Sequence, residues 1–277
     1  MEILRSKVFK FNFLQRKNFL NSSFFIIHYS FPKGGVGMRF AASSDIGKVR
    51  KINEDSYYIP EFNDKVKIFL IADGIGGQNH GQFAGMMTVE NVIRNIYREN
   101  NLEDKSTMLK NAVKSANDEI IKYATENQEF KGMGSTLVAL LIDIDKAYIT
   151  HAGDSRCYMI RNDVISQITV DNSYVEYLLQ KGVISTEQAK NHPQKNLIIK
   201  AIGMDTNLEL DLEIIDIKSG DMFLLCSDGL SSVLSDEEML HIIKRRKKDL
   251  QKAVEELVKI AKQTDGHDNI TAILMEV

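Results

Sequence analysis

Short apolar runs bounded by turn residues recur along the chain from residue 39 onward, and runs of about four to eight such residues predict β-strands. They occupy residues 67–73, 135–142, 147–154, 156–163, 208–217, 221–228 and 269–277. The run at 156–163 leads through the turn signal Asn162-Asp163 into residues 164–169. This pattern predicts a hairpin.

Apolar residues at helical spacing predict helices at 81–99, 106–127 and 248–263, within a total of about four or five. The predicted strands cluster in hairpins instead of alternating with every helix, which favours an α+β fold with layered sheets over a doubly wound parallel sheet. The chain has three prolines and shows no repeat or Ser-rich linker. We therefore expect residues 38–277 to form one domain.

Composition narrows the class of protein. With 277 residues, of which 43% are hydrophobic, the chain is long enough to bury a substantial core. Its net charge is −3 and no basic stripe carries interleaved aromatics, which argues against a nucleic-acid-binding protein. Cys157 and Cys226 lie inside apolar runs and form no Cys-x-x-Cys pattern, so we expect two reduced core thiols in a cytoplasmic protein.

Residues 1–37 differ from the rest, with seven of the thirteen Phe and six basic residues against one acid. Their longest apolar run, FFIIHY, is far below the roughly 18 residues of a membrane-spanning helix, and no signal-peptide cleavage pattern follows. The codons of Lys33-Gly34-Gly35 can accommodate a purine-rich ribosome-binding sequence shortly before Met38. We therefore hypothesise that translation begins at Met38. A disordered or surface-docked extension is the alternative.

Four acids share one local pattern, in which the carboxylate stands at the end of an apolar run beside small residues. They are Asp73, Asp154, Asp228 and Asp268, and the triplet Asn-Glu-Asp at 53–55 precedes a further short strand. Any one of them alone is most simply a turn or cap residue. Four from distant segments suggest convergence, and crowded carboxylates repel unless a cation compensates them. Oxygen ligands without Cys select Mg²⁺ or Mn²⁺ over Zn²⁺.

Six motifs now carry a specific resemblance. In order, they are GKVRKINEDS (47–56), ADGIGGQNHG (72–81), GMGSTL (132–137), HAGDSR (151–156), LLCSDGL (224–230) and DGHDNIT (265–271). The set resembles the metal-dependent protein phosphatases, also called the protein phosphatase 2C family, in their compact bacterial form. The resemblance implies a four-layer α-β-β-α sandwich with two packed, mainly antiparallel sheets. A flap subdomain is implied at about 168–205.

The resemblance also implies a role for each site residue. By this resemblance, Asp73 bridges two Mn²⁺ or Mg²⁺ ions, the Gly74 carbonyl binds one of them, and Asp228 and Asp268 bind the other. Glu54 acts through a metal-bound water, and Asp154 with Asp228 matches a third metal site. Arg50 holds the phosphate, and Asp55 and Asn269 orient the metal ligands. A water shared by the two cations then attacks phosphorus directly. No G-x-S-x-G elbow or activated cysteine offers a covalent alternative.

The expected activity is hydrolysis of phosphoserine and phosphothreonine in proteins, counteracting a bacterial Ser/Thr kinase and acting on that kinase's substrates. We expect a monomer without nucleic-acid partners or stable membrane insertion. The alternative is a catalytically silent relative that binds metal or phosphoproteins. A nucleotide-binding reading of DGIGG fails, because Ile75 stands where the first glycine is required. Ile75 and Asn172 also replace histidines found in many relatives, which leaves the general acid open.

Overall fold

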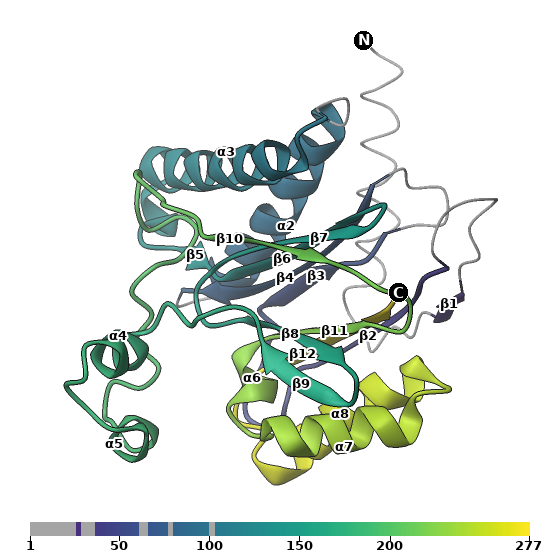
Figure 1. Ribbon diagram of the computed structural model, residues 1–277. Coiled ribbons are helices and arrows are strands. Elements are labelled where there is room, and N and C mark those ends of the chain that lie inside the picture. The colour runs from purple at the N-terminus through teal and green to yellow at the C-terminus, as the bar shows by residue number, and fades with distance from the viewer. Residues whose placement is uncertain (1–25, 29–36, 61–65, 77–79, 100–102) are drawn as a thin grey trace.

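The apolar runs form two antiparallel β-sheets in the computed structural model, which describes residues 26–28, 37–60, 66–76, 80–99 and 103–277 (Figure 1). One sheet has the order β1 (Ile26–His28), β2 (Arg39–Asp45), β12 (Ile270–Glu276), β11 (Met222–Cys226), β8 (Arg156–Arg161) and β9 (Val164–Gln167). The other has the order β10 (Leu212–Asp216), β7 (Lys146–Ala152), β6 (Leu137–Asp143), β4 (Lys67–Ile75) and β3 (Asp55–Tyr58), and β5 (Gly134–Ser135) pairs with β4. We call them the β2–β12 sheet and the β4–β6 sheet.

Helices cover the outer face of each sheet (Figure 1). The helices α2 (His80–Arg98) and α3 (Lys105–Glu126) lie over the β4–β6 sheet, whereas α7 (Asp236–Arg246) and α8 (Leu250–Thr264) lie over the β2–β12 sheet. The predicted four-layer α-β-β-α sandwich is therefore confirmed. The described chain also contains α4 (Tyr174–Gln180), α5 (Thr186–Lys190), α6 (Asp228–Ser231) and the 3₁₀ turn η1 (Gln128–Phe130). The seven α-helices exceed the predicted four or five, because α4, α5 and α6 are too short to show a helical period.

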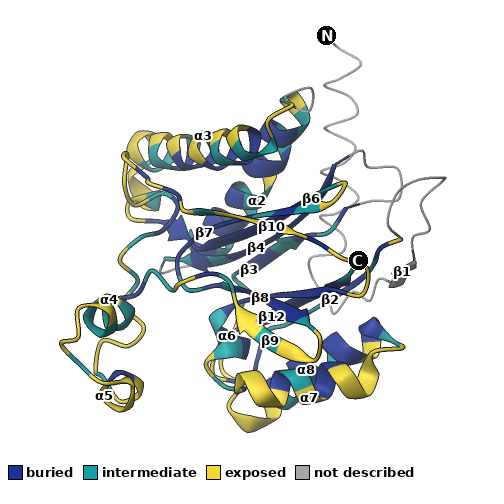
Figure 2. Ribbon diagram, viewed as in Figure 1, coloured by how far each residue is buried: buried dark blue, intermediate teal, exposed yellow. Residues whose placement is uncertain are grey.

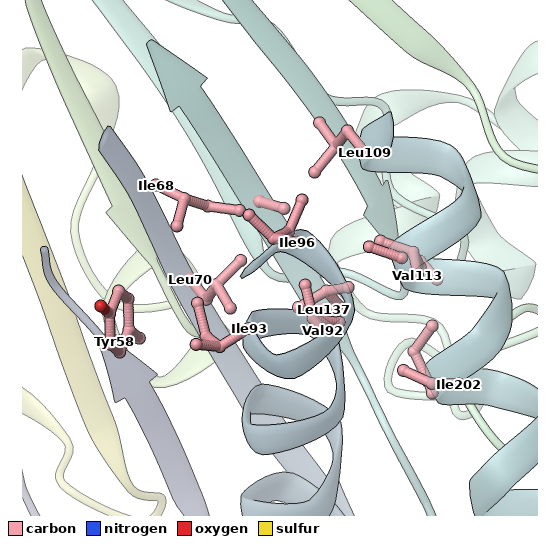
Figure 3. Packing of buried hydrophobic residues seen from close by; sticks show 14 of the residues in the cluster. Tyr58, Ile68, Leu70, Val92, Ile93, Ile96, Leu109, Val113, Leu137 and Ile202 are labelled. Carbon is pink, nitrogen blue, oxygen red and sulfur yellow. The ribbon is translucent and has the colours of Figure 1, made fainter. Parts of the chain in front are cut away.

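Three apolar cores hold the layers together, and Figure 2 shows buried residues concentrated in the sheets and exposed ones on the outer helices. Between the sheets, Phe40 packs edge-to-face on Phe69 at a ring-centroid distance of 5.1 Å. Figure 3 shows the core under α2 and α3, where Ile68 and Leu70 of β4 meet Ile96. Strands buried on both faces explain why the β4 and β11 segments are continuous apolar runs.

The strand register brings the acid-bearing ends of the strands to one end of the sandwich. Asp55 at the start of β3 pairs with Asp73 near the end of β4. In the other sheet, Ile270 at the start of β12 pairs with Asp45, and Cys226 at the end of β11 pairs with Ala272. Because neighbouring strands are antiparallel, the segments that follow β4, β7 and β11 lie beside those that precede β3 and β12.

The predicted hairpin is confirmed by β8 and β9. Asn162 and Asp163 join these strands at φ angles of 53° and 64°. A two-residue turn of this kind requires positive φ at both central residues, and Asn and Asp tolerate that conformation better than most side chains.

Two sequence predictions concern domain boundaries. Of the predicted extension 1–37, the structure describes β1, which pairs with β2, and Gly37; the rest, including Lys33-Gly34-Gly35, lies outside the described residues. The hypothesis of a start at Met38 stays a prediction. The segment 168–205 contains α4 and α5, which project beside the sandwich in Figure 1. Among the described helices, none is both long and apolar enough to cross a membrane.

Candidate active site

Asp73 occupies the centre of the site. Its backbone N–H donates to Thr136 Oγ1 at 2.9 Å, and its carbonyl accepts from the N–H of Thr136 at 2.8 Å. Burial raises the pKa of the Asp73 carboxyl well above its ordinary value, and the neighbouring carboxylates of Asp55, Asp228, Asp268 and Asp154 raise it further. The strand register places all five acids at the same end of the sandwich, with Asp55 directly opposite Asp73, so their charges repel one another.

Asp55 ties the two sheets together beside Asp73. Its Oδ2 accepts hydrogen bonds from Ser227 at 2.8 Å and from Thr271 at 2.6 Å, both in the opposite sheet layer. Its Oδ1 is buried without a hydrogen-bond partner in the described structure. Burial raises the pKa of Asp55 to about 7, even though the two hydroxyls act in the opposite direction. Asp55 therefore links β3 to the segments that carry Asp228 and Asp268, and its Oδ1 has no hydrogen-bond partner there; its predicted role in orienting Glu54 or a metal-bound water stays a prediction.

Asp228 and Asp154 project from the turns that follow β11 and β7. Asp228 is the first residue of α6, and burial together with the Asp268 carboxylate raises its pKa to about 6. Burial and the Asp228 carboxylate raise the pKa of Asp154 to about 7. Each has a buried Oδ1 without a hydrogen-bond partner in the part of the chain that the structure describes. A buried carboxylate oxygen without a hydrogen bond lowers the stability of the fold unless a positive charge or a hydrogen-bond donor lies beside it.

Arg50 lies at the outer edge of the cluster with a side chain that is 45% exposed. Its Nη2 donates to Asp268 Oδ2 at 2.8 Å, and its Nη1 lies 3.6 Å from Glu54 Oε2. Burial raises the pKa of Glu54, against the opposing effect of Arg50. The structure thus brings these three predicted residues together and leaves the guanidinium half open to solvent, where it can meet an anionic substrate.

Backbone packing brings Glu54 against Gly74 and Gly81. The N–H of Gly74 donates to the Glu54 carbonyl at 3.2 Å. A Cβ at Gly74 would lie 1.9 Å from the Gly81 carbonyl oxygen, and one at Gly81 would lie 2.5 Å from Glu54 Oε1. Only glycine fits either position, which explains why the chain has glycine at 74 and 81. Asn269 completes the contact, because its Oδ1 accepts from the Glu54 N–H at 2.8 Å.

Asn172, in the segment 168–205, is joined to the turn that carries Asp154. Asn172 Oδ1 accepts from the Gly153 N–H at 3.1 Å, and its N–H donates to the Gly153 carbonyl at 2.8 Å. Beside it, Arg156 forms a bidentate ion pair with Asp171 at 2.8 and 2.7 Å. Asn172 therefore acts as a fixed hydrogen-bonding group here and cannot supply a proton in the way a histidine could.

The nine predicted site residues all come together, yet the carboxylates do not form a preformed metal site. Among the described residues, no group of three or more His, Cys, Asp or Glu side chains is arranged to hold a metal ion. Two hydroxyls donate hydrogen bonds to Asp55, and Arg50 donates one to Asp268, so these carboxylate oxygens already have partners. The donor set still fits hard divalent cations, because it consists of oxygen atoms and leaves Oδ1 of Asp154 and of Asp228 buried without a partner.

Sequence reasoning missed several groups that hold this cluster. Ser227, Thr271 and Thr136 supply the hydroxyls that fix the acids, and Gly81 gives room for Glu54. Ser227 and Thr271 lie within three positions of a predicted acid, in the motifs CSDG and DNIT, whereas Thr136 lies in GSTL, 63 positions from Asp73. The position of a hydroxyl residue beside a predicted acid could have indicated a hydrogen bond. Short polar residues are common near turns, however, and the sequence does not show which groups they bond.

Comparison with known proteins gives consistent results. A family model described as protein phosphatase 2C matches residues 48–275. The chain is 37% identical over 237 residues to the serine/threonine phosphatase stp of Listeria innocua, covering 84% of this chain and 93% of that protein. It is 33% identical over 240 residues to the serine/threonine protein phosphatase PstP of Mycobacterium tuberculosis, covering 87% of this chain and 45% of that protein.

Solved structures agree in fold. The serine/threonine phosphatase Stp1 of Staphylococcus aureus superposes with a TM-score of 0.82 at 32% identity, covering 91% of this chain and 99% of that one. The catalytic domain of PstP, solved in complex with two manganese ions, superposes with a TM-score of 0.75 at 32% identity, covering 86% of this chain and 97% of that one.

Proposed function

Because this chain belongs to the protein phosphatase 2C family and is a protein serine/threonine phosphatase, we propose that it hydrolyses phosphoserine and phosphothreonine by direct attack of water at the acid cluster around Asp73. One observation carries the proposal. Asp73, Asp154, Asp228 and Asp268 come from separate segments but lie at the same end of the sandwich, where each of the other three raises the pKa of Asp73. Such a cluster requires compensating positive charge at neutral pH.

Divalent cations, Mn²⁺ or Mg²⁺, are the proposed source of that charge, by analogy with the manganese complex of the PstP catalytic domain. Asp73, Asp228, Asp268 and the Gly74 carbonyl would hold two ions, Glu54 would act through a water, and Asp154 with Asp228 would hold a third. When bound, such ions lower the pKa of water and neutralise charge that develops on the phosphate. Asp55 and Asn269 keep these ligands oriented through Ser227, Thr271 and the Glu54 N–H.

Arg50 binds the phosphate in this proposal. Its planar guanidinium can donate two parallel hydrogen bonds to phosphate oxygens, and its half-exposed position at the edge of the cluster leaves donors open. Asp268 and Glu54 hold the side chain from behind. Arg50 therefore orients the phosphorus atom above the acid cluster without taking part in proton transfer.

Water as the nucleophile is supported by the state of the two cysteines. Cys157 and Cys226 are fully buried, and burial raises the pKa of both thiols, that of Cys226 to about 12. A thiol in that state has almost no nucleophilic thiolate at neutral pH. The substrates in this proposal are phosphoproteins, including a bacterial Ser/Thr kinase and the proteins which that kinase modifies.

Hydrolysis of p-nitrophenyl phosphate and of a phosphothreonine peptide, with Mn²⁺ titrated against a chelator, tests the proposal. Wild-type protein should turn over both substrates only with free Mn²⁺, and Asp228→Asn should lose at least about 100-fold in kcat. Turnover that survives chelation, or an unaffected variant, would remove the mechanism. Manganese binding without any turnover would instead support the catalytically silent alternative.

A further inference from the structure

A cationic cavity lies at the end of the β2–β12 sheet opposite the acid cluster. It has a volume of about 560 Å³ and is formed by the β8–β9 turn, the segment before β11 and the last turn of α7. Its charged lining consists of Arg161, Lys218, Lys244, Lys247, Asp163 and Asp221. Four cations against two acids give the lining side chains a net charge of +2, in a chain whose net charge is −3.

The acids in the cavity are already neutralised. Asp221 is nearly buried and receives two hydrogen bonds from Arg161, at 2.8 and 2.5 Å, and one from the Lys218 N–H at 2.7 Å. Asp163 is paired with Lys244 at 2.9 Å. The ammonium groups of Lys218 and Lys247, by contrast, are exposed, and neither forms a salt bridge among the described residues. These two charges are therefore available to a partner.

Three apolar side chains, Ile160, Met222 and Ile243, also line the cavity, from β8, β11 and α7. A lining with two uncompensated cations beside apolar side chains suits a peptide that carries acidic residues beside an aliphatic one. A nucleic-acid strand would need a longer basic track with aromatic side chains for base stacking, and this lining contains no aromatic residue. From this charge complementarity we propose that the cavity docks an acidic segment of the protein substrates; the proposal rests on the proposed phosphatase function.

The distance between the cavity and the acid cluster determines which substrates can bind both. Arg161 and Met222 lie at one end of β8 and β11, and Arg156 and Cys226 lie at the end next to the acid cluster. Arg156 and Arg161 are five residue steps apart along β8, which corresponds to about 17 Å. The docked segment is therefore remote from the phosphorylated residue, and a phosphopeptide of about five residues or fewer is too short to occupy both sites at once.

The test compares two substrates and two charge-matched variants. One substrate is a short phosphothreonine peptide without acidic residues. The other carries the same peptide joined through a Gly-Ser linker of about 15 residues, roughly 20 Å in root-mean-square length, to a segment of Glu and Leu. The cavity variant is Lys218→Glu with Lys247→Glu. The control variant is Lys114→Glu with Lys122→Glu, two exposed lysines of α3 on the other side of the sandwich.

We expect wild-type protein and control to hydrolyse the long substrate with a KM about tenfold lower than the short one, and the cavity variant to lose this advantage while its kcat and its turnover of the short substrate stay unchanged. Fluorescence anisotropy of the labelled Glu-Leu segment should show binding that weakens about tenfold in the cavity variant and again in 1 M salt. Lys218→Gln with Lys247→Gln repeats the test with a milder change at the end of α7.

Equal KM advantage in the cavity and control variants would overturn the docking proposal, as would tighter binding of a single-stranded oligonucleotide than of the Glu-Leu segment. The proposed function fails separately, if wild-type protein with Mn²⁺ turns over neither substrate. Anisotropy still decides the docking question in that case, because it requires no turnover.

Discussion

Replacing Asp228 with Asn should make the protein more stable in the absence of divalent cations, although the variant is expected to be inactive. The substitution keeps the shape of the side chain and removes one of the crowded charges. Burial and the Asp268 carboxylate raise the pKa of Asp228 from an ordinary 3.8 to about 6. Since each pKa unit is worth about 1.4 kcal/mol, the ionised carboxylate costs the folded state about 3 kcal/mol at pH 8.

The dependence on pH has a definite sign. A group whose pKa is higher in the folded state than in the unfolded state stabilises the fold fully below the unfolded value and loses that contribution as pH rises through the folded value. The advantage of Asp228→Asn in chelator should therefore be about 3 kcal/mol at pH 8 and shrink to roughly 1 kcal/mol at pH 4.5. Urea unfolding followed by circular dichroism measures this difference in unfolding free energy at each pH.

With Mn²⁺ bound, wild-type protein should be more stable than Asp228→Asn. A ligand that binds only the folded state stabilises it in proportion to the logarithm of its concentration over the dissociation constant, so wild-type protein should gain more from Mn²⁺ than the variant does. Asp118→Asn, at an exposed position of α3, is the control and should change stability by less than about 0.5 kcal/mol under every condition. If Asp228→Asn is neutral or destabilising at pH 8 in chelator, the acids do not repel as described.

Three further substitutions test the surroundings of the acids. Arg50→Lys should raise KM for the phosphothreonine peptide nearly as much as Arg50→Ala, about tenfold or more, because an ammonium cannot make the bidentate contact; a lysine variant that retains wild-type KM would contradict this. Gly81→Ala should reduce kcat at least about tenfold, because the new methyl would lie 2.5 Å from Glu54 Oε1. Asn172→Ala leaves the Gly153 N–H without its acceptor and should speed hydrogen exchange at that amide, with a loss of about 1–2 kcal/mol in unfolding free energy.

The strands and the convergence of acids followed from the sequence because buried strands give continuous apolar runs and each acid stands where a run stops. The exact boundaries of the strands could not all be predicted in this way. The run at 135–142 predicts one strand, whereas Ser135 belongs to β5 and β6 begins at Leu137. The break occurs at Thr136, whose N–H and hydroxyl both bond the backbone of Asp73. A contact between residues 63 positions apart leaves no local pattern.

The charge arrangement of the cationic cavity was equally invisible in the sequence. The basic run at 244–248 is typical of a solvated helix end, and the sequence does not say which of its side chains are compensated. In the structure Arg245 and Arg246 pair with Glu256 of α8, which leaves Lys247 facing the cavity. That distribution depends on how α7 packs on α8, which only the folded chain determines.

The place of β12 in its sheet has a consequence for synthesis. This strand lies between β2 and β11, and Asp268 lies two residues before its start. The ribosome releases β12 after β1, β2, β8, β9 and β11, so the middle of that sheet stays empty until residues 270–276 have emerged. A nascent or prematurely terminated chain would then have neither a closed sandwich nor a complete set of acids. We therefore expect dephosphorylation only from chains that extend through β12.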